Sequence, residues 1–153
     1  MSRYAACLCT DRKMLVPTLF AASEIKARSR AAGNDLDVIV FTPPGEVDAK
    51  GRDWMAARGI LLDESFETAG WKSLVVVARL HPVTLIRLHL ARHLAHRYEK
   101  FLYLDADITI HGPVDAIFRL DTGSAPLAAC AANPISGNAE IRAATEAHLR
   151  AIG

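Results

Sequence analysis

Residues 101–107 read Phe-Leu-Tyr-Leu-Asp-Ala-Asp, an apolar run that ends in two aspartates one residue apart. A short, uncharged run rich in aromatic residues predicts a central strand buried on both faces of a parallel sheet. Ligands of open α/β sheets bind outside the carboxyl ends of the strands, so Asp105 and Asp107 are expected to reach a common cleft. Their oxygens suit a hard divalent cation. An alternative stays open, in which the two aspartates cap a turn.

Apolar runs and turn residues predict an alternating order of strands and helices along the chain. Strands are expected at Tyr4–Cys9, Leu36–Phe41, Ile60–Leu62, Phe101–Leu104 and Ala125–Cys130. Helices are expected at residues 17–30, 47–58, 82–98 and 139–152, with a brief one at 115–118. For Leu74–Val77 the pattern leaves open a strand or a packed loop. This alternation predicts an α/β fold with a mainly parallel, Rossmann-like sheet flanked by helices.

The composition limits the classes of function. A chain of 153 residues is expected to form one domain, and a net charge of +1 argues against a nucleic-acid-binding surface. No apolar stretch approaches the length of a transmembrane segment, and the N-terminus lacks the apolar core of a signal peptide. Three cysteines, two of them in the first expected strand, favour reduced thiols and a cytoplasmic protein.

Arg87 is the second informative residue. In a helix that begins at Pro82, Arg87 is expected to share the apolar face of Val83, Leu90 and Leu94. An arginine on a core-facing stripe needs an anionic partner, because a buried unpaired charge is costly. A phosphate or a carboxylate would satisfy it, and an internal ion pair with Asp105 or Asp107 is the open alternative.

Three histidines on the same expected helix invite comparison with a zinc site. His89, His93 and His96 are spaced by four and three residues, but the zinc-protease motif requires a glutamate where this chain has Leu90. Because arginines are interleaved, a solvated basic face is the better interpretation. A Gly-x-Ser-x-Gly nucleophile motif and a Gly-x-x-x-x-Gly-Lys phosphate loop are both absent from the sequence.

Taken in order, these motifs resemble the N-terminal part of the family-eight glycosyltransferases, of the glycogenin and galactosyltransferase kind, which have a GT-A fold. The strongest match is residues 98–118, where a basic linker leads into Tyr-Leu-Asp-x-Asp and then a short helix. Residues 86–88 are similar to the family's helix motif with a basic residue, and residues 7–11 to the end of its first strand.

The resemblance implies a nucleotide-sugar donor, most often a UDP-sugar, and transfer with retention of the anomeric configuration. It implies manganese or magnesium as the cofactor, with Asp105 and Asp107 as metal ligands. The donor-binding residues that it implies are Leu8, Thr10, Asp11, Arg87, Asp105, Ala106 and Asp107. The first three are expected to bracket the nucleobase beside the cleft. The catalytic residue, the donor sugar, the acceptor and an oligomeric state are left open.

The sequence also departs from the family's pattern. Met14 stands where a tyrosine is frequent, and the late His-x-x-Gly-x-x-Lys-Pro segment that supplies a third metal ligand is absent. We therefore expect residues 1–153 to be a partial donor-binding domain without the acceptor part. Two alternatives stay open: a nucleotide-sugar-binding remnant without catalysis, and an Asp-x-Asp phosphotransferase, for which the chain offers no convincing partner residue.

Overall fold

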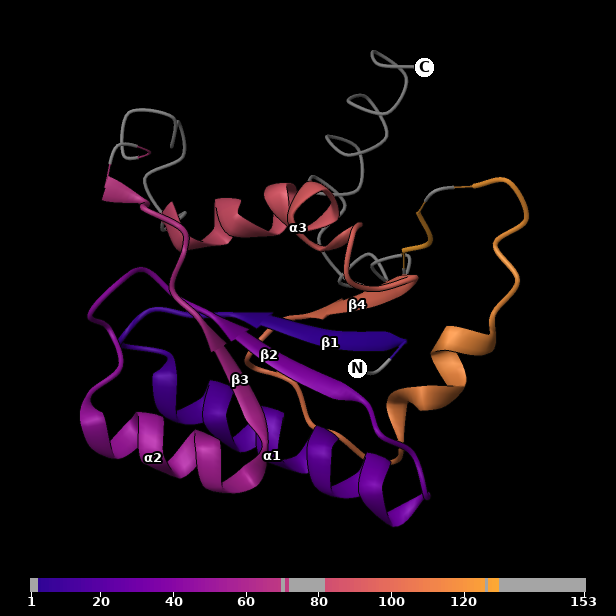
Figure 1. Ribbon diagram of the computed structural model, residues 1–153, viewed down its shortest axis with the longest axis horizontal. Coiled ribbons are helices and arrows are strands. Elements are labelled where there is room, and N and C mark those ends of the chain that lie inside the picture. Colours follow the sequence, from indigo (N-terminus) through magenta and orange to yellow (C-terminus); the bar gives the residue numbers. More distant parts are fainter. Residues whose placement is uncertain (1–2, 70, 72–81, 126, 130–153) are drawn as a thin grey trace, which may run out of the picture. The chain divides into compact units, whose positions relative to one another are not determined.

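The computed structural model describes residues 3–69, 71, 82–125 and 127–129 (Figure 1). The chain divides into two units, residues 1–120 and 121–153. The helices and strands of the described residues belong to the first unit. In chain order they are β1 (Tyr4–Cys9), α1 (Leu15–Ala31), β2 (Asp37–Phe41), α2 (Ala49–Arg58), β3 (Ile60–Asp63), the 3-10 helix η2 (Pro82–Leu85), α3 (Ile86–Leu94), β4 (Lys100–Leu104) and the 3-10 helix η3 (Val114–Arg119).

The four described strands form one parallel sheet in the order β3-β2-β1-β4, which confirms the predicted α/β fold. In its register Leu8 lies opposite both Val40 and Leu104. Beyond the paired residues, the Thr10 N–H still donates to the Phe41 carbonyl at 2.9 Å. The register therefore brings the carboxyl ends of β1, β2 and β4 to the same edge of the sheet, where ligands of such sheets bind.

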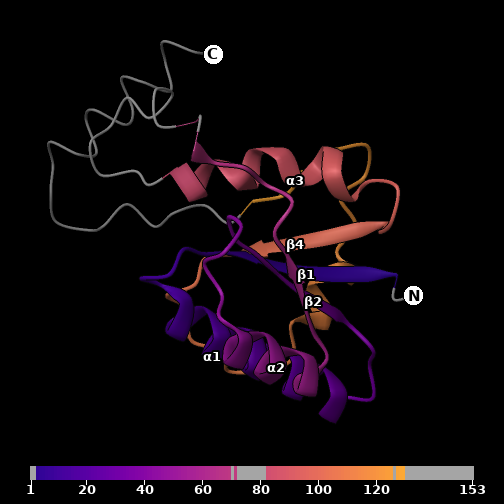
Figure 2. The same cartoon turned by 60° about the vertical axis from the view of Figure 1, so that its left-hand side comes forward.

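Helices cover both faces of the sheet: α1 and α2 lie on one face and α3 on the other (Figure 1 and Figure 2). Because successive side chains of a strand point to opposite faces, each central strand contributes to two cores. Ala6 and Leu8 of β1 belong to the cluster on the α1 side, whereas Ala5 and Cys7 belong to the cluster on the α3 side. This two-sided cover explains why the strands read as continuous apolar runs.

Local signals set the two ends of α2, which begins two residues after the predicted start and ends at Arg58 as predicted. The Asp48 side chain accepts a hydrogen bond from the Gly51 N–H at 2.7 Å, and so caps the first turn. Gly59 ends the helix in the left-handed conformation, with φ 67°. A residue with a Cβ atom would be strained there, because its backbone would adopt a conformation that only glycine reaches easily.

The 101–104 strand was predicted to be buried on both faces, and the structure shows it less buried than that. Among the described strands β4 pairs with β1 alone, and Phe101–Leu104 are half-buried. Phe101 and Tyr103 still pack against the α3-side core, and Leu102 and Leu104 against the α1-side core. Contacts with a core on each face explain why this strand is apolar although it is only half-buried.

The helix predicted to run from Pro82 to about Tyr98 is shorter in the structure. It begins as the 3-10 helix η2 and ends as α3 at Leu94, where the Arg97 and Tyr98 N–H groups both donate to the Leu94 carbonyl. The Tyr98 side chain is buried, and its hydroxyl donates to Asp37 at 2.8 Å. The chain must turn there, because β4 begins two residues later.

Three further expectations concern Leu74–Val77, Ala125–Cys130 and residues 139–152. Ala125 and residues 127–129 adopt no strand, so the strand predicted at Ala125–Cys130 is wrong in its described part. A turn stands there instead, in which the Gly123 N–H donates to Asp121 and the Ala125 N–H to the Thr122 carbonyl. Leu74–Val77 and the helix predicted at residues 139–152 lie outside the described residues.

Candidate functional site

A pocket of about 260 Å³ lies where β1 and β4 end, beside the start of α3. Four segments meet in it: the two strand ends, the residue that precedes α1, and the η2–α3 junction. Its lining consists of Cys9, Thr10, Asp11, Met14, Val83, Thr84, Arg87, Tyr103, Asp105, Ala106 and Asp107. Residues more than 90 positions apart in the sequence therefore share one cavity, because parallel strands end on one edge.

Asp105 and Asp107 both line this pocket, which confirms the prediction of a common cleft. They follow β4 in a turn, with the small side chain of Ala106 between them. The Tyr103 hydroxyl donates to Asp105 Oδ1 at 2.7 Å. Arg87 Nη1 lies 3.7 Å from the same oxygen, so the ion pair expected between Arg87 and one of the aspartates is confirmed.

The expected position of Arg87 on a core-facing stripe is wrong. Ile86, Leu90 and Leu94 form the buried stripe of α3, while the Arg87 side chain is 38% exposed. The predicted phase assumed an α-helix from Pro82, but Val83 lies in a 3-10 helix, which has three residues per turn. Val83 is therefore no guide to the buried stripe of α3, and Arg87, one residue or about 100° round the helix from Ile86, reaches the rim of the pocket.

Thr10 and Asp11 line the pocket at the end of β1, as predicted, but part of their polar capacity is used locally. The Thr10 hydroxyl donates to the Asp11 carbonyl at 3.0 Å and accepts from the Thr18 hydroxyl at 2.8 Å. Asp11 Oδ1 accepts the N–H groups of Lys13 and Met14, at 2.9 and 3.0 Å. Asp11 thus shapes the turn that leads into α1.

Leu8 is not among the lining residues, and its expected place beside the cleft is wrong for its side chain. That side chain is fully buried in the core on the α1 side. Cys9, one residue later, points to the opposite face and lines the pocket instead. Burial raises the pKa of the Cys9 thiol to about 12, so the thiol is neutral near pH 7.

Three carboxylates, Asp11, Asp105 and Asp107, and one guanidinium, that of Arg87, line the pocket. Burial, followed by the hydrogen bond to Asp105, raises the pKa of the Tyr103 hydroxyl, which therefore stays a proton donor. Within the described part of the chain, His, Cys, Asp and Glu side chains form no cluster of three or more that could hold a metal ion. A cation bound here would be coordinated by two carboxylates and by oxygen atoms of a bound ligand.

Tyr103 is the site residue that sequence reasoning missed. It precedes Asp105 by two positions, and a strand places such residues on the same side. Besides its hydrogen bond to Asp105, its ring lies beneath the Arg87 guanidinium, with 5.0 Å between the Arg87 Cζ atom and the ring centroid. The period of two in β4 could have indicated this contact.

The solvated face expected for the histidines is confirmed for His89 and His96, which are exposed, whereas His93 is half-buried. His93 Nε2 lies 2.9 Å from Asp63 Oδ2, and its ring packs against Phe41 and Phe66. His89 stacks on Trp71 with 5.0 Å between ring centroids. Burial alone would raise the pKa of Asp63, but hydrogen bonds from Ser65 and from His93 outweigh it and lower that pKa.

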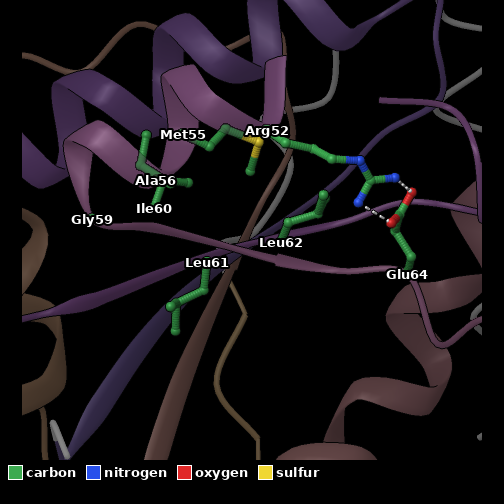
Figure 3. A pocket seen from close by; sticks show the side chains of 8 residues that line it. All are labelled: Arg52, Met55, Ala56, Gly59, Ile60, Leu61, Leu62 and Glu64. Atoms are coloured by element: carbon green, nitrogen blue, oxygen red, sulfur yellow. Dashed lines mark hydrogen bonds and ion pairs between the residues drawn. The ribbon is translucent and has the colours of Figure 1, made fainter. Parts of the chain in front are cut away.

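A second and larger pocket, of about 370 Å³, lies along the outer edge of β3 beside α2 (Figure 3). Its walls are mostly apolar, and its one pair of opposite charges is already matched. Arg52 Nη2 donates to Glu64 Oε1 at 2.8 Å, and Arg52 Nη1 lies 2.5 Å from Glu64 Oε2. This pocket offers no unbalanced charge for a polar ligand.

The parallel sheet, with a charged pocket at the ends of its strands, defines an α/β protein whose pocket lies at the edge where such sheets bind ligands. A family model described as glycosyl transferase family 8 matches residues 63–149, more than half of the chain. The chain therefore belongs to glycosyl transferase family 8, which makes it a glycosyltransferase by family. The matched region contains Arg87, Asp105 and Asp107, whereas Thr10 and Asp11 precede it.

No curated protein matches the chain. None of the helices in the described part of the chain combines the length and the apolar character that crossing a bilayer requires.

Proposed function

We propose that this glycosyltransferase binds a nucleotide-sugar donor, most readily a UDP-sugar, in the pocket at the ends of β1 and β4. The sugar would be transferred with retention of its anomeric configuration, as the family resemblance implies. The observation that carries the proposal is the meeting of Asp105, Asp107 and Arg87 around one pocket. The first strand end, with Thr10 and Asp11, closes the same pocket on the side proposed for the nucleoside.

The donor set of the pocket fits a divalent cation such as manganese or magnesium. Its candidate protein ligands, Asp105 and Asp107, offer carboxylate oxygens, which hard cations prefer. Magnesium-type sites commonly use one or two carboxylates together with substrate phosphates and water, so a third protein ligand is not required. When bound, the ion would neutralise negative charge that develops on the diphosphate leaving group.

The chain's own residues would orient the donor. Arg87 stands at the rim with three-fifths of its side chain covered, where its planar guanidinium can bind a phosphate through parallel hydrogen bonds. Ala106 presents no bulky side chain between the two aspartates. Thr10 and Asp11 are held rigidly by their local hydrogen bonds, which suits a surface against which a nucleoside packs.

Isothermal titration calorimetry with UDP tests the proposal. We expect UDP binding that requires manganese and is lost with EDTA. Asp107→Ala should weaken this binding at least tenfold, because it removes one of two candidate protein ligands. Asp53→Ala is a matched control, since Asp53 is an exposed aspartate of α2 outside the pocket. UDP binding of equal strength with and without manganese would contradict metal dependence.

A second assay separates binding from catalysis. Incubation of the chain with a UDP-sugar and manganese should release UDP, by transfer or by hydrolysis of the donor, and Asp107→Ala should abolish the release. Tight UDP binding with no release above that of Asp107→Ala would instead support a domain that binds donor without transferring it.

A further inference from the structure

Three side chains at the candidate site form a connected group: Tyr103, Asp105 and Arg87. Asp105 Oδ1 is the shared atom, since it accepts the Tyr103 hydroxyl at 2.7 Å and lies 3.7 Å from Arg87 Nη1. The Tyr103 ring supports the guanidinium from below, at 5.0 Å from its centroid to Arg87 Cζ. One aromatic residue therefore contacts both members of the ion pair.

The two contacts of Asp105 differ in strength. The Tyr103 hydrogen bond is short and involves a charged acceptor, which makes it one of the stronger kinds. The distance of 3.7 Å to Arg87 is too long for a hydrogen bond, and both partners are exposed, at 38% and 57% of their side chains. Solvent weakens such a pair, so another cation can replace Arg87 at Asp105.

Arg87 keeps its place by other means. Its Nε–H donates to the Thr84 carbonyl at 2.9 Å, one turn earlier, and its guanidinium rests on the Tyr103 ring. Release from Asp105 would thus leave Arg87 at the pocket rim, with its Nη groups available for an anion. Loss of the Arg87–Asp105 ion pair would therefore make Asp105 available to a cation and Arg87 available to a phosphate.

We propose that Arg87 and a divalent cation compete for Asp105, and that Tyr103 is the positioning residue that holds Asp105 while the two cations exchange. This inference rests on the proposed function, because it concerns the same metal and donor site. Its consequence is a coupling between the two ligands: metal binding frees Arg87 for the donor diphosphate, and by reciprocity the diphosphate favours metal binding.

The test is a manganese titration of the full chain without nucleotide, followed by electron paramagnetic resonance of free Mn²⁺. Arg87→Gln should bind Mn²⁺ about two- to fivefold more tightly than the wild type, because the competing cation is gone. At saturating Mn²⁺ the same variant should bind UDP about tenfold more weakly, because a charged hydrogen-bond donor is lost. A residue with a merely structural role would not shift the two affinities in opposite directions.

Two further variants complete the design. Arg92→Gln makes the same change in net charge on the same helix outside the pocket, and it should leave both affinities unchanged. Tyr103→Phe keeps the ring and removes the hydroxyl, so it should weaken Mn²⁺ binding about threefold while circular dichroism remains that of the wild type.

The outcomes separate the two proposals. A wild-type chain that binds no Mn²⁺, even with UDP present, would overturn the proposed metal site and this inference with it. Mn²⁺ binding by the wild type that Arg87→Gln leaves unchanged or weakens would overturn the inference alone. An equal gain in affinity for Arg92→Gln would also overturn it, because bulk charge would then explain the effect.

Discussion

The two pockets described above differ in their charged side chains as well as in their size. The pocket along β3 is the larger. The charges of its Arg52 and Glu64 neutralise each other, and its other walls are apolar. The pocket at the ends of β1 and β4 is smaller, and its three carboxylates face one guanidinium. Two exposed carboxylates, Asp105 and Asp107, at the ends of parallel strands, rather than volume, indicate a ligand site here.

The largest effect that we expect concerns a residue behind the charged pocket. Leu8→Ala should reduce the free energy of unfolding by about 2–5 kcal/mol, because Leu8 is fully buried and its truncation leaves a cavity. The UDP affinity of the protein that stays folded should not change. Urea unfolding measures the stability, and calorimetry measures the UDP affinity. A stable variant that has lost UDP binding would show that Leu8 belongs to the site.

The next prediction compares one substitution in each of the two pockets. Asp105→Asn should weaken manganese-dependent UDP binding by about 100-fold, with little change in melting temperature, because Asp105 is exposed and its loss costs little packing. Glu64→Gln, in the larger pocket, should leave UDP binding at the wild-type level. If Glu64→Gln weakened UDP binding more than Asp105→Asn, the assignment of the two pockets would be reversed.

A smaller effect should come from the ion pair of the larger pocket. Arg52→Gln breaks its contact with Glu64, and we expect the melting temperature to fall by about 3 °C or less, since exposed pairs contribute little. The shift should shrink further at 1 M salt, where exposed charges are screened. A large and salt-independent fall would show that this pair organises the β3 edge.

The smallest effect is a pH dependence at Asp63. The pKa of Asp63 is lower in the folded protein than its usual value, so its contribution to stability is present above about pH 4 and is lost as the pH falls through the lowered pKa. Melting curves of the wild type and Asp63→Asn between pH 3 and 6 should therefore converge at the acid end. A difference that instead widened toward low pH would contradict the direction of the shift.

The fold could be predicted from the sequence because the signals that determine it are local. Apolar runs located the four described strands, Gly59 located the end of α2, and the alternation of elements predicted a parallel sheet. The Asp-Ala-Asp motif after an apolar run also predicted that the two aspartates share a pocket with the end of β1. These features depend on residue type and on a period of two or about four, both of which can be read along the chain.

The errors arose where a feature depends on the rest of the structure. How deeply β4 is buried depends on what packs against it, and its own residues would be apolar in either case. The position of Arg87 depends on which side of α3 packs on the sheet: Ile86, Leu90 and Leu94 are buried, and Arg87 lies at the pocket rim. The partner of His93 is Asp63 of β3, which lies 30 residues earlier in the sequence.

What the sequence determined by itself is therefore the set of elements and the carboxylates that end one of them. What only the tertiary structure decided is which side chains meet. Arg87 pairs with Asp105, Tyr103 contacts both of them, and Arg52 pairs with Glu64. The physical reason is that secondary structure follows from neighbours in the chain, whereas the energy of a charge depends on whatever the fold brings within a few ångströms of it.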